Sequence, residues 1–229
     1  MAATVHSPWQ WEKWKMGKWQ SLGSGQQAGT KRFIYNGSIM VHMVQNRNNI
    51  GDLDFEIILL LLRGEKHLRG IAAQLNQSHS TVLRRLNNLQ KENVLDYKKE
   101  GKNKVFFIKK SLQAKNYALN AERYKLIKLL KIYPEAGIVV EDIIQKCQEK
   151  LIVLFGSYAK FNAKKDSDID IYIETKSRKV KENVEMINSK IRAKIGKFDL
   201  DSNLIKEVIK DHIILKDSEG FYEKTKFFG

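Results

Sequence analysis

The sequence predicts an α/β (α+β) protein of two small domains, and three observations support that fold class. Apolar residues follow the 3–4 spacing of helices from Asp52 onward. The segment LIVLF, residues 151–155, is entirely apolar, which is typical of a buried strand. The segment DIDIYIE, residues 168–174, alternates between polar and apolar side chains, which indicates a strand with one buried face. The length of 229 residues suffices for two domains of about 100 residues each.

The formal net charge of +15 at pH 7 favours an acidic partner, and nucleic acid is the first candidate. A lysine-rich composition without such a partner is the alternative. Cys147 is the single cysteine, so no internal disulfide can form and a reducing, cytoplasmic location is expected. The longest apolar run, residues 57–62, is too short to cross a bilayer, so no membrane association is expected.

Residues 1–50 are expected to form a leader without regular structure. Its four tryptophans, Trp9, Trp11, Trp14 and Trp19, fall in one short stretch that has no helical period. The segment SLGSGQQAGT that follows is rich in small residues, as flexible segments are. A basic aromatic patch that contacts a membrane surface or single-stranded nucleic acid is the alternative interpretation.

Residues 51–110 are expected to form the first domain. Apolar spacing and caps such as Ser78 predict three helices, over about residues 52–64, 67–76 and 78–94. Two strands, over about residues 94–100 and 104–110, are joined by the polar tip Gly101-Lys102-Asn103, which predicts a hairpin. Three helices followed by a hairpin resemble the winged helix-turn-helix family over residues 54–110.

This resemblance implies that the start of the third helix enters the DNA major groove while the hairpin contacts phosphates. The candidate DNA-binding residues are His79, Ser80, Thr81, Arg84, Arg85, Lys98, Lys99, Lys102 and Lys104. Arg84 and Arg85 are expected to share the outer face of that helix, where Leu83 also lies. A winged helix used only for contact with another protein is the alternative.

A linker of residues 111–136 is expected to carry a helix over residues 112–132, which Pro134 and Gly137 end. This helix can join two protomers into a homodimer or pack within its own chain. The remaining domain, residues 137–229, is expected to contain a helix, two strands, a helix, a short strand and a final helix with an extended tail. Their approximate ranges are 138–149, 151–155, 168–174, 181–195, 197–201 and 204–224, with His212 in the final helix.

The sharpest motif is LIVLFGSYAKFNAKKDSDIDIYIE, residues 151–174. Gly156 and Ser157 follow the buried strand, and ten residues separate Ser157 from Asp168. Asp168 and Asp170 have the same parity on a strand, so their carboxylates point to one side. Two convergent carboxylates suit a pair of Mg²⁺ ions that neutralise a triphosphate. The Gly-Ser turn offers backbone N–H groups and a hydroxyl to the phosphates, and this Gly allows close approach.

This motif resembles the polymerase-beta-like nucleotidyltransferase superfamily over residues 138–229, and in size its minimal prokaryotic branch. The resemblance implies a third metal-binding carboxylate on a later short strand, which makes Asp199 the candidate and Asp201 the reserve. It implies that Asp199 also accepts the proton of the attacking hydroxyl. Lys160 and Phe161 stand where Arg and Gly are usual; Lys160 keeps the positive charge beside Gly156 and Ser157 in the nucleotide-binding set.

The resemblance implies an enzyme that uses Mg²⁺ to transfer a nucleoside monophosphate, AMP from ATP, to a hydroxyl. A non-catalytic transcriptional regulator that senses a nucleotide or docks a partner through this domain is the alternative. Minimal members act beside HEPN-domain toxins. The C-terminal domain is too short to include a dedicated acceptor-binding domain, so the acceptor would be held by the open face of the sheet, by the winged helix or by a partner that brings its own docking surface. Protein, tRNA and small-molecule acceptors all stay open. The third option favours a protein acceptor such as a HEPN-type toxin, modified on a Tyr, Ser or Thr hydroxyl.

Overall fold

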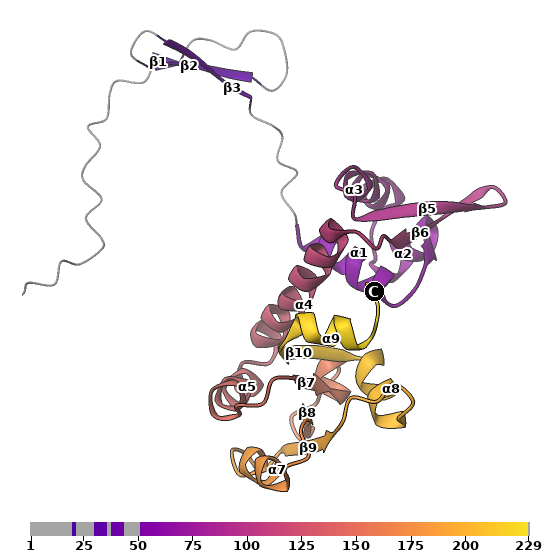
Figure 1. The fold of residues 1–229 in the computed structure, drawn as a ribbon. Helices are drawn as coiled ribbons and strands as arrows, with labels where there is room; N and C mark the ends of the chain where they lie inside the picture. Colours follow the sequence, from indigo (N-terminus) through magenta and orange to yellow (C-terminus); the bar gives the residue numbers. More distant parts are fainter. Residues whose placement is uncertain (1–19, 22–29, 36–37, 44–50, 229) are drawn as a thin grey trace, which may run out of the picture. The chain divides into compact units, whose positions relative to one another are not determined.

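The computed structural model describes residues 20–21, 30–35, 38–43 and 51–228, which belong to two compact units, residues 1–49 and 50–229 (Figure 1). The first unit contains an antiparallel sheet of β1 (Gln20–Ser21), β2 (Thr30–Tyr35) and β3 (Ser38–Met43). These strands differ from the predicted leader without regular structure. A sequence signal for them exists, because Asn-Gly between β2 and β3 is the pair that two-residue hairpin turns favour. The four tryptophans lie outside the described residues.

The first part of the second unit has the winged helix-turn-helix architecture that the sequence predicts. Its helices are α1 (Asp52–Leu62), α2 (Leu68–Gln74) and α3 (His79–Lys91). Its sheet has the order β4-β6-β5, from β4 (Lys66–His67), β5 (Leu95–Glu100) and β6 (Asn103–Ile108). Ile57, Val82 and Phe106 are buried in the core that these elements share. The two-residue strand β4 is too short to be read from a sequence pattern.

Two helices connect this part to the last domain. α4 (Leu112–Ile132) agrees with the predicted helix, and Ser111 caps it by accepting a hydrogen bond from the Ala114 N–H at 3.1 Å. α5 (Pro134–Lys146) begins at Pro134, whereas the sequence predicts a helix from about residue 138. Proline is favoured at the first helical position, because its missing N–H would have no partner there. Gly137 therefore lies inside α5 and does not end a helix.

The last domain is built on a mixed sheet with the strand order β10-β7-β8-β9. The strands are β7 (Ile152–Phe155), β8 (Ile169–Glu174), β9 (Ile191–Gly196) and β10 (His212–Lys216). β7 pairs antiparallel with both β8 and β10, and β8 pairs parallel with β9. The helices are α6 (Gly156–Ala159), α7 (Arg178–Glu185), α8 (Asn203–Lys210) and α9 (Ser218–Lys224).

Each face of this sheet is covered by its own apolar cluster. Ile171 belongs to the cluster that contains residues of α5 and α7, whereas Tyr172 belongs to the cluster that contains residues of α8 and α9. Alternate residues of β8 therefore face opposite layers of helices, as the strict alternation of DIDIYIE predicts. Because Asp170 has the parity of Tyr172, it faces the α8 side.

Three predictions for the last domain are wrong. The predicted helix over residues 181–195 ends at Glu185, and its second half is the strand β9. Ile191, Ala193 and Ile195 alternate with Arg and Lys, a period of two that a helical reading missed. The predicted strand over residues 197–201 is not regular structure. The final segment is a helix followed by an extended piece, as predicted, but His212 begins the strand β10, which pairs with β7, instead of lying in the helix, and a further helix, α9, follows.

The last domain contacts the winged helix through the end of the chain and through an ion pair. Phe227 and Phe228 pack against the apolar core of the winged helix, so the segment after α9 returns to the helices of that part (Figure 1). The Arg63 guanidinium, just after α1, lies 3.0 Å from the Asp211 carboxylate. No helix among the described residues is long and apolar enough to cross a membrane.

Candidate functional site

The turn after β7 lies directly against the carboxylate of Asp170. Gly156 has a φ of +72°, in the left-handed region that favours glycine. A Cβ atom at this position would lie 2.2 Å from Asp170 Oδ2. The next residue, Ser157, is half-buried at the start of α6. Only glycine fits here, and its fit brings the backbone of the Gly-Ser turn to the carboxylate on the neighbouring strand.

Asp168 and Asp170 lie at the start of β8, as the motif predicts. Asp168 is exposed just before the strand, and Asp170 is half-buried on it. Burial raises the pKa of Asp170, and the carboxylates of Asp168 and Glu207 raise it further, while Lys194 and Arg192 oppose them. The raised pKa means that the negative charge of Asp170 is poorly compensated, which is the condition that a bound cation would relieve. Glu207 on α8 is an acidic neighbour that the sequence motif did not point to.

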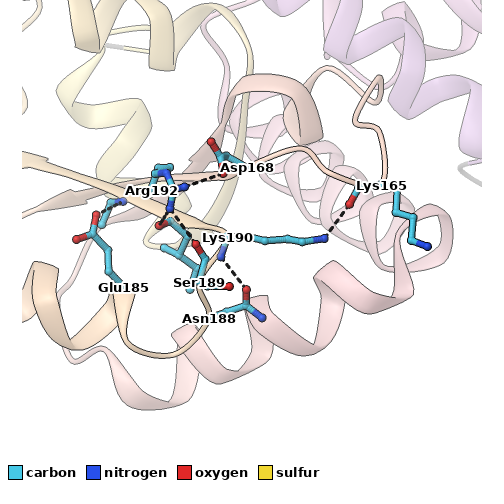
Figure 2. Close-up of polar contacts among 9 residues, drawn as sticks. Lys165, Asp168, Glu185, Asn188, Ser189, Lys190 and Arg192 are labelled. Atoms are coloured by element: carbon cyan, nitrogen blue, oxygen red, sulfur yellow. Dashed lines mark hydrogen bonds and ion pairs between the residues drawn. The ribbon is translucent and has the colours of Figure 1, made fainter.

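A basic residue stands beside the aspartate pair. In the parallel pairing of β8 with β9, Arg192 lies across from Asp170. Figure 2 shows the Arg192 side chain reaching Asp168, with Nη2 at 3.3 Å from Oδ1. Its Nη1 donates to the backbone oxygens of Ser189 at 2.9 Å and Ile191 at 3.2 Å. The neighbouring strand therefore presents a guanidinium where the family pattern leads one to expect a carboxylate.

Asp199 is not brought to this group. It lies three residues beyond the end of β9 and is exposed, and its Oδ1 accepts a hydrogen bond from the Asp201 N–H at 3.1 Å. β8 and β9 run parallel, and Asp170 is near the start of β8, so Asp199 lies toward the opposite end of the sheet. This corrects the expected convergence of Asp199, or of its reserve Asp201, with the pair. Within residues 51–228, no three or more His, Cys, Asp or Glu side chains are grouped to hold a metal ion.

The loop after the Gly-Ser turn has a residue in the left-handed backbone conformation that favours glycine, although this residue is not glycine. Phe161, at the position where the family usually has Gly, has a φ of +56°. Its N–H donates to the Tyr158 carbonyl at 3.1 Å, and its ring packs against the sheet's apolar cluster. The left-handed conformation costs a non-glycine residue about 1–2 kcal/mol, and the packing of the ring offsets it. Lys160, just before it, is exposed.

Fewer of the predicted DNA-binding residues are freely available on the outer face of α3 than the sequence predicts. His79, Ser80 and Arg84 are exposed, whereas the hydroxyls of Ser80 and Thr81 are within 3.0 Å and 2.8 Å of the Ser78 hydroxyl, which caps the helix. Ser80 and Thr81 thus take part in the cap as well as in any contact with DNA.

Arg85 does not share the outer face with Arg84. Its Nη1 lies 3.4 Å from the Asp54 carboxylate, and Asp54 is 5% exposed on α1. This corrects the assignment of Arg85 to the DNA-binding set, because the side chain links α3 to α1. Asn87, exposed one turn after Leu83, is a face residue that the sequence analysis did not single out. Asparagine is a common partner of adenine in the major groove.

The four predicted lysines of the hairpin have different surroundings. Lys99 and Lys102 are exposed near its tip, and the Lys104 ammonium lies 3.9 Å from the centre of the Tyr97 ring. The Lys98 ammonium lies 2.5 Å from a Glu65 carboxylate oxygen and 3.4 Å from one of Glu100. Its hydrogen bond to Glu65, and then that to Glu100, raise the pKa of Lys98. Lys98 would have to exchange these partners to contact a phosphate.

Comparison with known proteins identifies the class of the last domain. Residues 140–226 match the family model described as "Polymerase beta, Nucleotidyltransferase", and this part of the chain is a nucleotidyltransferase domain of that family. No curated protein matches the chain.

A solved structure that the chain resembles is the adhesin competence repressor AdcR from Streptococcus pyogenes, at 19% identity and a TM-score of 0.32. The match covers 44% of this chain and 69% of that one. This likeness is distant, and the winged-helix architecture rests on the elements described above.

Proposed function

We propose that this chain is a DNA-binding nucleotidyltransferase that transfers a nucleoside monophosphate, AMP from ATP, to a hydroxyl group. The observation that supports the proposal most directly is the close approach of Gly156 to Asp170: the Gly-Ser turn, to which we assign the phosphates, lies against a carboxylate. The match of residues 140–226 to the nucleotidyltransferase family supports the reaction class.

Within this proposal, each residue of the site has a separate task. The backbone N–H groups of Gly156 and Ser157 and the Ser157 hydroxyl would bind the phosphates of the nucleotide. Lys160 adds a positive charge next to them. Asp168 and Asp170 would hold Mg²⁺, because carboxylates are the oxygen ligands that this ion prefers and because Asp170 bears a poorly compensated charge. When bound, Mg²⁺ neutralises negative charge on the triphosphate.

The winged helix would bind DNA through the exposed start of α3 and the hairpin. His79, Ser80 and Arg84 are the residues of α3 that we place in the major groove, with Thr81 at the edge of that surface. Lys99, Lys102 and Lys104 would contact phosphates, where they add affinity but little sequence specificity. The net charge of +15 supports this partner.

A second candidate function is a regulator that binds the nucleotide without turnover. The observation that favours it is Arg192, which pairs with Asp168 and stands across from Asp170. A guanidinium there competes with a metal ion for Asp168, and it adds no ligand and no base to activate an acceptor. Nucleotide binding would then change DNA binding, and no product would form.

For the catalytic candidate we propose a protein acceptor, such as a HEPN-type toxin, modified on a Tyr, Ser or Thr hydroxyl. The structural role of the residues after β9 supports this proposal, because α8, β10 and α9 cover or extend the sheet. These residues therefore form no separate acceptor-binding domain, and a partner that brings its own docking surface would supply what they lack.

The test of this function uses ATP labelled at the α-phosphate, with Mg²⁺ and extract of the native host. Wild-type protein is compared with the Asp168→Asn/Asp170→Asn variant. The proposal expects label on a host protein with the wild type alone, identified by mass spectrometry as added AMP. Label on a tRNA or small molecule would retain the enzyme and replace the acceptor. Equal label with both proteins would exclude transfer by this site.

A further inference from the structure

A cavity of about 710 Å³ lies in the seam between the winged helix and the nucleotidyltransferase domain. One wall is the half-buried side of α1, including Leu59, and the facing wall is formed where α8 meets β10 and by the segment after α9. Three residues of α4 also line the cavity: Glu122, Lys125 and Lys128. Lys160 and Phe161, from the loop after the Gly-Ser turn, complete the lining. Asp168, Asp170 and Gly156 do not line it, so this cavity is distinct from the aspartate pair. Lys160, which we assign to the nucleotide phosphates, also lines this cavity, and its ammonium can serve only one of the two ligands at a time.

The charges of this cavity do not cancel. Its lining contains three acidic residues, and each has a cationic partner in the lining: Glu56 with Lys128 at 2.6 Å, Glu122 with Lys125 at 2.9 Å, and Asp211 with Arg63 at 3.0 Å. Two lining lysines remain, Lys160 and Lys210, and both are exposed. Within residues 51–228 neither forms an ion pair with an acidic side chain, so the cavity has two positive charges in excess.

Of these three ion pairs, the one between Glu122 and Lys125 is the most deeply buried. Glu122 is 2% exposed, and besides Lys125 it accepts a hydrogen bond from the Tyr222 hydroxyl at 3.0 Å. Burial alone would raise the pKa of Glu122, but the positive charges of Lys125 and His212 hold it at about 2. Lys125 and His212 therefore hold Glu122 in its ionised form, and it does not neutralise Lys160 or Lys210.

The volume of the cavity and the mixture of charged and apolar residues in its lining indicate which class of ligand it can bind. Cavities of about 300–1,000 Å³ bind small organic molecules. Apolar side chains from several elements, such as Leu59, Phe161, Ile209 and Phe227, line the space between the charged groups. An inorganic ion would leave these walls exposed to water, and a neutral apolar molecule would leave both lysines without a partner.

We propose that this seam cavity is a second ligand site, which binds a small organic phosphate monoester with an aromatic or aliphatic body. A phosphate monoester carries a charge of about −1.5 to −2 near neutral pH, which matches the two lysines. Its body packs between Leu59 of the winged helix and Phe161 of the nucleotidyltransferase loop. Because the ligand touches both domains, its binding favours one arrangement of the two and couples DNA affinity to occupancy of the cavity.

The experiment is a fluorescence titration of the full chain with 1-naphthyl phosphate in the presence of EDTA, so that no divalent ion loads the aspartate pair. We expect saturable binding of one molecule per chain. 1-Naphthol and inorganic phosphate should each bind at least about tenfold more weakly, because each lacks half of the complementary chemistry. Absence of saturable binding by the wild type would overturn the proposal.

Variants decide whether the binding takes place in this cavity. Lys210→Gln removes one lining charge and should weaken binding about tenfold. Lys206→Gln, one turn earlier on α8 and outside the lining, is the matched control and should bind like the wild type. Leu59→Trp fills the cavity and should abolish binding while circular dichroism shows a folded chain. If Lys210→Gln binds as tightly as the wild type, the site is wrong, whether or not the Leu59 variant folds.

Discussion

Arg192 Nη2 lies 3.3 Å from Asp168 Oδ1, which gives one of the two motif aspartates a protein cation as its partner. Both side chains are about half exposed, at 52% and 49%, so the pair is screened by water and contributes little to stability. The pair matters for ligand binding, because a metal ion at Asp168 must share this carboxylate with the Arg192 guanidinium or displace the guanidinium.

Removing this guanidinium should therefore strengthen metal binding. We expect Arg192→Ala to lower the Mg²⁺ concentration that gives half of the maximal thermal stabilisation, by a few-fold, because a half-exposed pair is worth about 0.2–1 kcal/mol. Lys179→Ala, which removes an exposed charge on α7, is the control. If the two variants respond to Mg²⁺ alike, Arg192 does not compete for this site.

Gly156 should tolerate no side chain. The Gly156→Ala Cβ atom would meet Asp170 Oδ2 at 2.2 Å, in a backbone conformation that alanine disfavours. We expect a loss of about 2–5 kcal/mol in the free energy of unfolding, from strain and overpacking together. Gly70→Ala in α2 is the control, because its Cβ meets nothing within 4 Å and alanine favours helix. Urea unfolding of both variants tests this, and equal stability would mean that the turn relaxes.

The charge of Asp170 should cost stability in the absence of metal. Its pKa is raised in the folded chain, so the stabilising effect of the protonated form is present below the unfolded pKa and is lost as the pH rises through the folded pKa. Asp170→Asn should therefore be more stable than the wild type at pH 7 in EDTA, and the difference should shrink toward about pH 3. A variant that is less stable at pH 7 than the wild type would show that the carboxylate is structurally required.

Two adjacent arginines should have different roles. Arg84→Ala should weaken DNA binding and make it less dependent on salt, with little effect on stability, because Arg84 is exposed on α3. Arg85→Ala should cost about 1–3 kcal/mol of stability, because it removes a partner of the buried Asp54 carboxylate. DNA affinity by fluorescence anisotropy and urea unfolding separate the two effects. If Arg84→Ala leaves DNA affinity unchanged, the recognition face is misplaced.

Local patterns predicted much of this fold. The helix α3 and its Ser78 cap, the hairpin of β5 and β6, and the approach of the Gly-Ser turn to Asp170 all depend on residues close in the sequence. Each has a strong local signal, such as a capping hydroxyl, a polar tip or a fixed spacing.

The errors concern features that tertiary pairing decides. Residues 191–196 form a strand because they pair with β8, and this pairing places Arg192 rather than Asp199 beside the aspartates. In the same way, the Arg85 side chain lies away from the outer face of α3 because it pairs with the buried carboxylate of Asp54 on another helix. Helical and strand periods differ little over such short segments, so the sequence alone could not decide between them.

The most direct measurement is calorimetry of ATP binding with Mg²⁺, followed by product analysis of the same samples. The site built from Gly156, Asp168 and Asp170 predicts that the wild type binds ATP and that Asp168→Asn/Asp170→Asn binds it much more weakly or not at all. Pyrophosphate in the wild-type sample with an acceptor present supports transfer, and binding without product supports the regulator. Equal ATP affinity in wild type and variant would contradict the assignment of the nucleotide site to these residues.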